Sequence, residues 1–174
     1  LKKAVFCILE RMDGRNMISF DPNIRKKLWG SNDYSKLLRE IGDRCSVLML
    51  GLEEAKVIYG TDKPDVLADE LYKNNRLQFL AIKDGGNGAD VYDGRKHYHI
   101  PPFKCSPEDM IGAGDAFNAA FLAGILEGKD LYTCGKMGGI AGAMATEVSG
   151  DTEGYPFREQ MEYCLNGIPG EVFR

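Results

Sequence analysis

Apolar residues recur along the chain with two periods, one typical of helices and one typical of buried strands. The first apolar residues have helical spacing, at Val5, Ile8, Leu9 and Met12. This pattern predicts a helix that stops at Gly14. The segment NMISFDPN (16–23) then predicts a short buried strand that ends at Asp21, because Pro22 and Asn23 after it favour a turn.

The order of helix and strand repeats further along the chain. The next predicted elements are a helix over 31–44, a strand over 45–50, helices over 52–60 and 63–75, and a strand over 77–83. The first of these helices has candidate caps at Ser31 and Asn32 and a stop at Gly42. Both strands are continuous apolar runs, which is typical of parallel strands buried on both faces. Strands that alternate with helices imply a mostly parallel sheet covered by helices on both faces.

The second half of the chain is mainly helical. A hairpin is predicted around Asp93 and Gly94, between two segments of alternating polarity. Helices are predicted over 116–126, 130–148 and 158–167. In the first of them Asn118 is the only polar side chain, so this helix is expected to have no solvent-exposed face and to lie in the middle of the molecule. No linker is evident that would divide the chain.

Composition narrows the classes of function. The chain has 174 residues, 44% of them hydrophobic and 28% charged, and a formal net charge of -4. These values fit a globular protein without a membrane segment, and they argue against a partner that is nucleic acid bound through a basic patch. The five cysteines are scattered and indicate reduced thiols in the cytoplasm rather than zinc ligands or disulfides.

The segment DMIGAGDAFNAAFLAGILEG (109–128) carries the strongest chemical signal. The first N–H groups of a helix lack partners and carry partial positive charge, which suits an anion such as phosphate. Gly112 and Gly114 would let that anion approach the backbone, and Asp115 in the first turn would be ready to accept a proton. Alone, the same residues fit a simple turn with a capping aspartate.

The segment GAGDAFNAAFLAGILEG (112–128) resembles the C-terminal signature of the ribokinase-like (PfkB) carbohydrate kinase family. Three further segments resemble that family in the same order: FDPNIRKKLW (20–29), IKDGGNGADVYDG (82–94) and SGDTEGYP (149–156). The first and the last of these three resemble the branch of the family that phosphorylates 2-keto-3-deoxygluconate. Four ordered matches are far more specific than any one of them.

The resemblance implies a three-layer α/β/α fold of the ribokinase type, of which residues 1–174 would form the C-terminal, nucleotide-binding and catalytic portion. The family's N-terminal half, with its Gly-Gly sugar motif and the small β lid, has no counterpart in this sequence. Because the chain begins without Met and inside a helical pattern, we expect it to be a piece of a longer protein. Family members commonly dimerise through the lid, which leaves a homodimer of the full-length protein open.

Roles for individual residues follow from the resemblance. Asp115 would be the catalytic base and contact the sugar hydroxyl, and the anion hole would be formed by Gly112, Ala113 and Gly114. Asn23 and Arg25 would lie at the mouth of the cleft near phosphates or the sugar acid. The nucleotide would be bordered by Lys83, Gly85, Gly88, Gly139 and Gly142. Glu54 matches the acidic position of the family's Asn-x-x-Glu motif and would help to organise Mg²⁺ through water.

The sequence departs from the family at three places. Gly51 replaces the Asn of the magnesium motif, and Gly139 replaces a nucleotide-contacting Asn. Met110 and Ile111 stand where many relatives have threonines, which leaves a monovalent-cation site open.

The expected function is ATP- and Mg²⁺-dependent phosphorylation of a sugar or sugar acid, with 2-keto-3-deoxygluconate as the preferred substrate. Ribokinase-like and fructokinase-like specificities are the alternatives within the class, and we expect this portion alone to be inactive. Outside the class of sugar kinases, the alternative is a nucleotide-binding module without kinase activity. A dinucleotide-dependent oxidoreductase fits poorly, because Gly-x-Gly-x-x-Gly after an early strand is absent.

Overall fold

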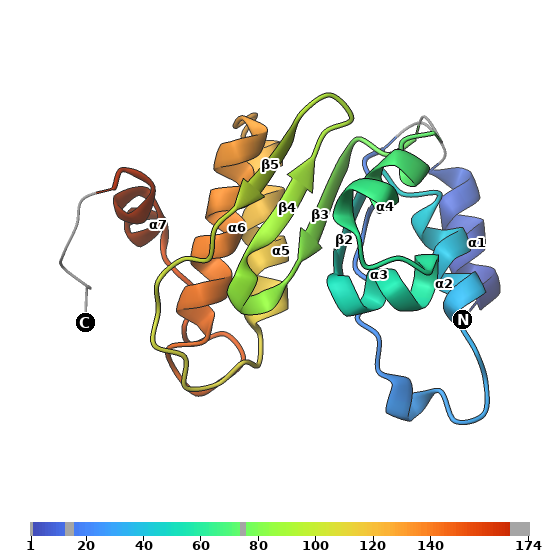
Figure 1. Cartoon of the computed structure of the whole chain (residues 1–174), viewed down its shortest axis with the longest axis horizontal. Helices are drawn as coiled ribbons and strands as arrows, with labels where there is room; N and C mark the ends of the chain where they lie inside the picture. The colour runs from blue at the N-terminus through green and yellow to red at the C-terminus, as the bar shows by residue number, and fades with distance from the viewer. Residues whose placement is uncertain (1, 13–15, 74–75, 168–174) are drawn as a thin grey trace. The chain divides into compact units, whose positions relative to one another are not determined.

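The computed structural model describes residues 2–12, 16–73 and 76–167 (Figure 1). The chain divides into two compact units. The first unit contains Leu1–Lys83 and Tyr92–His97, and the second contains Asp84–Val91 and Tyr98–Arg174. The boundary runs through a hairpin rather than a linker, which is why no shift in composition marks it in the sequence.

Helices and strands follow each other in the order that the apolar pattern predicts. The helices are α1 (Lys2–Arg11), α2 (Ser35–Gly42), α3 (Leu52–Tyr59), α4 (Pro64–Leu71), α5 (Ala113–Leu126), α6 (Leu131–Ala145) and α7 (Arg158–Leu165), with short 3-10 helices η1 (Lys26–Leu28) and η2 (Gly85–Asn87). The strands are β1 (Ser19–Phe20), β2 (Val47–Gly51), β3 (Phe79–Lys83), β4 (Ala89–Tyr92) and β5 (His97–Ile100), in the sheet order β1-β2-β3-β4-β5. The expected α/β fold with a mostly parallel sheet is confirmed.

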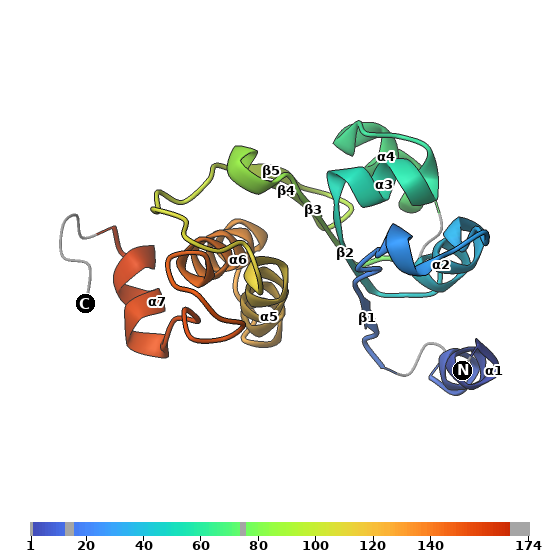
Figure 2. The same ribbon diagram turned by 90° about the horizontal axis from the view of Figure 1, so that it is seen from below.

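The first unit is built on three parallel strands. Ser19 of β1 pairs with Val47 of β2, and Gly51 at the end of β2 pairs with Lys83 at the end of β3. The four residues from Val47 to Leu50 are almost completely buried, as their continuous apolar run predicts. Helices α2, α3 and α4 contribute to the core around β2 and β3, and α3 and α4 lie side by side in Figure 2. The carboxyl ends of the parallel strands therefore meet at one edge of this unit.

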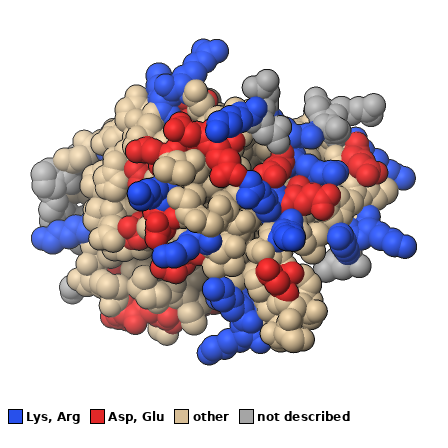
Figure 3. Space-filling model, turned by 45° about the vertical axis from the view of Figure 1, so that its right-hand side comes forward, with Lys and Arg blue, Asp and Glu red and all other residues tan. Residues whose placement is uncertain are grey.

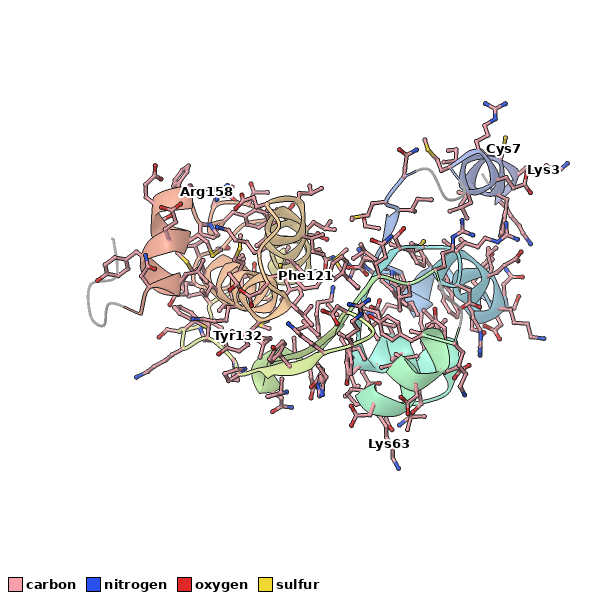
Figure 4. All side chains as sticks on the ribbon, turned by 90° about the horizontal axis from the view of Figure 1, so that it is seen from above. Lys3, Cys7, Lys63, Phe121, Tyr132 and Arg158 are labelled. Carbon is pink, nitrogen blue, oxygen red and sulfur yellow. The ribbon has the colours of Figure 1, made fainter. Side chains whose placement is uncertain are left out.

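The second unit contains helices α5, α6 and α7 together with residues 89–91 of β4 and 98–100 of β5. Phe121 of α5 is fully buried (Figure 4), and the rings of Tyr98 and Tyr132 meet edge to face at 5.5 Å between β5 and the start of α6. The Asp130 carboxylate caps α6, because it accepts hydrogen bonds from the amide (3.1 Å) and the hydroxyl (2.6 Å) of Thr133. Arg158, labelled at the start of α7 in Figure 4, forms an ion pair with Glu127, which follows α5.

The predicted strand over 16–21 is wrong in length and in burial. Only Ser19–Phe20 form β1, and Ser19 is exposed while Phe20 is half-buried. Edge strands are commonly short, and among the described residues β1 stands at one end of the sheet order, with a parallel partner on one side. The chain then leaves the ladder at Asp21, whose carboxylate accepts a hydrogen bond from the Asn23 amide at 3.0 Å.

The predicted cap of the next helix is also wrong. Helix α2 begins at Ser35 rather than after Ser31 or Asn32. The Asn32 amide donates to the Trp29 carbonyl at 3.1 Å, so Asn32 belongs to the turn after η1. The Asp33 carboxylate instead accepts from the Ser35 amide at 2.9 Å, and this bond together with the Ser35 hydroxyl lowers the pKa of Asp33. The stop at Gly42 is confirmed, whereas Gly14, the predicted stop of the first helix, lies outside the described residues.

The prediction that α5 has no solvent-exposed face is wrong. Leu126 is 78% exposed, and Gly114, Asp115 and Ala119 are exposed as well. The buried residues of α5 form one stripe, with Ala116, Phe117, Asn118, Phe121 and Gly124. In the second unit α6 packs against this side of α5, with Gly138 beside Phe117 and Gly124 beside Cys134 and Met137, whereas Ala119 and Leu126 on the other side are exposed.

None of the helices in the described ranges is both long and apolar enough to span a membrane. Basic and acidic side chains are interspersed over the face that Figure 3 shows. On this face opposite charges lie near each other, so the binding of an anion would depend on local groups rather than on a broad positive field.

Candidate active site

The turn at the start of α5 has a backbone shape that requires glycine. Gly112 is the N-cap residue and lies in the left-handed region, with φ 76° and ψ -13°. A Cβ atom at this position would clash with the Asp151 carbonyl oxygen. The Gly112 carbonyl accepts hydrogen bonds from the Ala116 amide at 2.9 Å and from the Tyr155 hydroxyl at 3.3 Å. The segment 151–155 therefore holds the backbone turn from which α5 begins.

The first turn of α5 is open to solvent. Gly114 and Asp115 are exposed, and Gly112 and Ala113 are half-buried. Burial raises the pKa of the Tyr155 hydroxyl, and the nearby carboxylates of Asp115 and Asp151 raise it further. An anion could thus approach the first amides of α5 while the Asp115 carboxylate remains accessible as a proton acceptor.

The two predicted nucleotide residues of α6 lie beside α5 and β5. A Cβ atom at Gly142 would come within 3.1 Å of the Ala113 carbonyl oxygen, so Gly142 allows α6 to approach the first turn of α5 closely. A Cβ atom at Gly139 would stand 3.6 Å from Ile100, which is ordinary contact. Close packing therefore explains Gly142 but does not explain Gly139.

The predicted nucleotide loop forms a tight turn between β3 and β4. The Asp84 amide donates to the Gly88 carbonyl at 2.8 Å, and the Gly88 amide donates to the Gly85 carbonyl at 3.1 Å. Gly88 has φ 100°, and a Cβ atom there would clash with the Ile100 carbonyl oxygen. Gly85 is exposed, with free space around it. Both glycines thus have a positive φ that favours glycine, since Gly85 has φ 50°, and the free space at Gly85 leaves room for a ligand.

A second group of predicted site residues gathers at the carboxyl ends of β1, β2 and β3 in the first unit. The Lys83 ammonium forms an ion pair of 2.9 Å with the Asp21 carboxylate, and both side chains are about one-fifth exposed. Asn23 has the positive φ of 41°, the only one among the described non-glycine residues. Arg25 follows as an exposed residue at the start of η1. Ligands of open α/β sheets bind at this edge of the parallel strands.

Glu54 joins this group through two backbone amides. One carboxylate oxygen accepts from the Ile24 amide at 2.6 Å, and the other accepts from the Gly51 amide at 2.8 Å. Gly51 is the N-cap residue of α3 and Glu54 is the third residue of the helix, so the second bond is one half of a capping box. Glu54 is half-buried, whereas its neighbour Glu53 is exposed.

The structure therefore gathers the predicted site residues into two groups, each in its own unit. The first unit holds Asn23, Arg25, Glu54 and Lys83, and the second holds Gly85, Gly88, Gly112, Ala113, Gly114, Asp115, Gly139 and Gly142. No group of three or more His, Cys, Asp or Glu residues in the described ranges is arranged to hold a metal ion.

Sequence reasoning missed three residues that support these groups. Asp21 pairs with Lys83, Tyr155 donates to Gly112, and the Asp151 carbonyl faces Gly112. The segments that contain them, FDPNIRKKLW and SGDTEGYP, were recognisable in the sequence. Their contacts join residues that are 62 and 43 positions apart, which local spacing cannot reveal.

Two curated relatives illustrate the similarity of this chain to sugar kinases. The chain is 31% identical to a 2-dehydro-3-deoxygluconokinase of Bacillus subtilis over 153 residues, which cover 86% of the chain and 46% of the relative. It is 30% identical to a fructokinase of Escherichia coli over 153 residues, which cover 83% of the chain and 50% of the relative. The chain thus spans about half the length of the curated relatives it matches.

Solved structures agree on the fold. A fructokinase from Vibrio cholerae O395, solved with fructose, ADP and calcium ion bound, superimposes with a TM-score of 0.82 at 21% identity. The match covers 94% of this chain and 55% of that structure. The model of the pfkB family of carbohydrate kinases matches residues 1–158. Together with the glycine turn before Asp115, this match shows that the chain belongs to the PfkB family of carbohydrate kinases.

Proposed function

We propose that this chain is the C-terminal, nucleotide-binding and catalytic portion of a kinase that transfers the γ-phosphoryl group of ATP to a hydroxyl of a sugar or sugar acid. One observation carries the proposal: the left-handed turn at Gly112 opens α5 with exposed Gly114 and Asp115 in its first turn. An anion-binding helix start beside an accessible carboxylate combines the two functions that phosphoryl transfer to a hydroxyl needs.

In the proposed mechanism Asp115 accepts the proton of the sugar hydroxyl. The hydroxyl oxygen forms a bond to the γ-phosphorus as the bond from that phosphorus to the β–γ bridging oxygen breaks, and ADP leaves. The amides of the first turn of α5 stabilise the negative charge on the phosphoryl oxygens in the transition state. Tyr155 and Asp151 hold the Gly112 turn in the shape that exposes these amides.

The residues present fit an ATP phosphate better than they fit a directly bound metal ion. Gly112 carries no side chain at the turn, and the neighbouring first turn is exposed, so a phosphate has room to approach. Both oxygens of Glu54 already accept hydrogen bonds from backbone amides. We therefore infer that Mg²⁺ would be held mainly by phosphates and water, as is common for this ion, and would neutralise phosphate charge.

The preferred substrate is proposed to be 2-keto-3-deoxygluconate. Support comes from the relative named as a 2-dehydro-3-deoxygluconokinase and from the exposed Arg25, whose guanidinium can pair with a carboxylate in a bidentate manner. The fructokinase relative is almost equally similar, so fructose is the main competing substrate. Comparing kcat/KM of the intact protein for the two substrates tests this choice, and a higher value for fructose would reject the sugar acid.

The test of the catalytic role is Asp115→Asn in the intact protein. We expect kcat to fall by about 10²- to 10⁴-fold, because the amide cannot accept the proton. Asp69→Asn on the exposed surface of α4 is the matched control and should leave kcat unchanged. If Asp115→Asn and the original protein turn over substrate equally fast, the proposal that Asp115 is the catalytic base is rejected.

A nucleotide-binding module without kinase activity is the second candidate. It is favoured by Gly51 and Gly139, which stand where the family resemblance expects asparagines. Calorimetry of the intact protein with ATP and Mg²⁺, run beside the kinase assay, separates the two candidates. Binding without turnover of any sugar would favour the module and overturn the kinase.

A further inference from the structure

We propose that Glu54 is a positioning residue, which fixes the turn over residues 21–25 and so determines where the Arg25 guanidinium stands. The role of Arg25 toward an anionic substrate rests on the proposed function. The role of Glu54 toward the turn rests on contacts within the first unit alone. This positioning role differs from the role in organising Mg²⁺ that the family resemblance implies for Glu54.

The Glu54 carboxylate connects two segments that are far apart in sequence. Its bond of 2.6 Å to the Ile24 amide spans 30 residues and reaches the middle of the turn, directly before Arg25. Its bond of 2.8 Å to the Gly51 amide anchors the same carboxylate to the end of β2. Bonds from amides to a carboxylate are stronger than bonds between neutral groups. The end of β2 thus serves as a fixed point for the turn.

A second carboxylate holds the other end of the same turn. Asp21 accepts from the Asn23 amide at 3.0 Å and pairs with the Lys83 ammonium at 2.9 Å. Lys83 is the last residue of β3, in register with Gly51 at the end of β2. The turn is therefore tied to the ends of two neighbouring strands, through Asp21 on one side and Glu54 on the other.

The backbone of the turn needs such support. Asn23 has φ 41°, and a left-handed conformation is unfavourable for a residue with a side chain, although Asn tolerates it better than most. The amide of Asn23 is bound by the Asp21 carboxylate, and the next amide, of Ile24, is bound by the Glu54 carboxylate. These two bonds oppose the relaxation of Asn23 to an extended conformation. Loss of the Glu54 bond would let Arg25 adopt several positions, which would weaken its contact with a bound anion.

Backbone amide exchange measured by NMR on the intact protein is the direct test. Ile24 lies in a turn outside the strand ladders, so its amide should be protected only if Glu54 binds it. In Glu54→Gln we expect exchange at Ile24, at Gly51 or at both to accelerate about ten- to a hundredfold, because one acceptor oxygen becomes a donor group. Exchange at Leu48 and Leu50 in the core should not change, and neither should any of these amides in the control Glu53→Gln.

Kinetics separate positioning from magnesium organisation. In Glu54→Gln we expect KM for the sugar acid to rise about tenfold, with a smaller change in kcat and no change in the Mg²⁺ concentration that gives half the maximal rate. In the background of Arg25→Gln the same substitution should raise KM no further, because Glu54 acts through Arg25.

An unprotected Ile24 amide in the original protein would overturn the proposal, and this measurement needs no variant to fold. Unchanged exchange at Ile24 and Gly51 in Glu54→Gln, or a severalfold shift in the Mg²⁺ requirement with unchanged KM for the sugar acid, would overturn it as well. If the intact protein phosphorylates no sugar, the proposed function fails, while the exchange experiment still decides how Glu54 acts on the turn.

Discussion

Two helices of this chain begin with the same spacing of residues but use it differently. Helix α3 follows Gly51 and has Glu54 as its third residue, and α5 follows Gly112 and has Asp115 as its third residue. The Glu54 carboxylate turns back to the Gly51 amide and also binds the Ile24 amide. In α5, the N-cap residue Gly112 makes no side-chain capping bond, and Asp115 is exposed. The Glu54 carboxylate is therefore engaged by backbone amides, whereas the Asp115 carboxylate is exposed to solvent.

The backbone before each helix explains this difference. Gly51 is extended, with φ -77° and ψ 155°, and presents its amide to the helix end in the way a capping box requires. Gly112 is left-handed, with φ 76° and ψ -13°, and its carbonyl is engaged by Tyr155. Aspartate is also one methylene shorter than glutamate. Identical spacing of a glycine and an acid therefore does not define a function until the backbone of the cap is known.

The largest effect should come from the body of α5, which anchors its exposed first turn. Phe121 is fully buried, so Phe121→Ala should lower the free energy of unfolding by about 3–5 kcal/mol. Leu126→Ala on the same helix removes a side chain that is 78% exposed and should change it by about 0.5 kcal/mol or less. Urea denaturation of the intact protein measures both, and similar losses in the two variants would contradict the one-sided burial of α5.

The next largest effect should come from the cap of α5. Gly112→Ala should cost about 3 kcal/mol, because a left-handed Ala is strained and its Cβ atom would clash with the Asp151 carbonyl. Gly128→Ala is the matched control, since Gly128 is also left-handed with φ 69° but has free space around it, and it should cost about 1 kcal/mol. The two variants can be compared by urea denaturation. Equal costs would show that segment 151–155 does not constrain the turn.

The cap of α3 should respond to the loss of its carboxylate. Glu54→Ala leaves the Ile24 and Gly51 amides without their acceptor and should lower the free energy of unfolding by about 2 kcal/mol. Glu53→Ala, at the exposed neighbouring position, should change it by about 0.5 kcal/mol or less. Thermal unfolding of the two variants side by side tests this, and equal melting temperatures would mean that the two glutamates are equivalent.

The smallest effect should come from Tyr155→Phe. The variant loses the hydrogen bond of 3.3 Å to the Gly112 carbonyl but retains the ring, so we expect a cost of about 1 kcal/mol. If Tyr155 acts only by holding the turn, the same substitution should lower kcat of the intact protein by less than Asp115→Asn does. A loss of kcat as large as that of Asp115→Asn would indicate that the Tyr155 hydroxyl takes part in the chemistry itself.

Much of the fold could be predicted from the apolar pattern. The runs that became β2 and β3 are long, continuous and buried on both faces, and the helices between them have clear starts and stops. The predicted bounds of the shorter elements β1 and α2 were wrong, because such bounds depend on single hydrogen bonds, such as that from the Ser35 amide to Asp33. The prediction that α5 has no exposed face was wrong for another reason: composition gives the mean polarity of a helix but not how many of its sides are covered.

The candidate site was predictable only in part. The segment that contains Gly112 and Asp115 could be recognised because its glycines, its acid and its helix are consecutive in the chain. The role of Glu54 could not be read from its spacing to Gly51, because the decisive partner is the Ile24 amide, 30 residues away. Lys83 also gained a partner, Asp21, that lies 62 residues away.

The sequence by itself determined the class of fold, the family and the residues proposed for phosphoryl transfer, because periodicity and consecutive motifs are local properties of the chain. Only the tertiary structure decided that Glu54 is hydrogen-bonded to backbone amides and that Asp115 is exposed. Whether a carboxylate finds an amide donor depends on the φ and ψ angles of the cap and on which distant segment packs against it. For Glu54 both conditions are met, and for Asp115 the left-handed Gly112 leaves the carboxylate exposed at the start of α5.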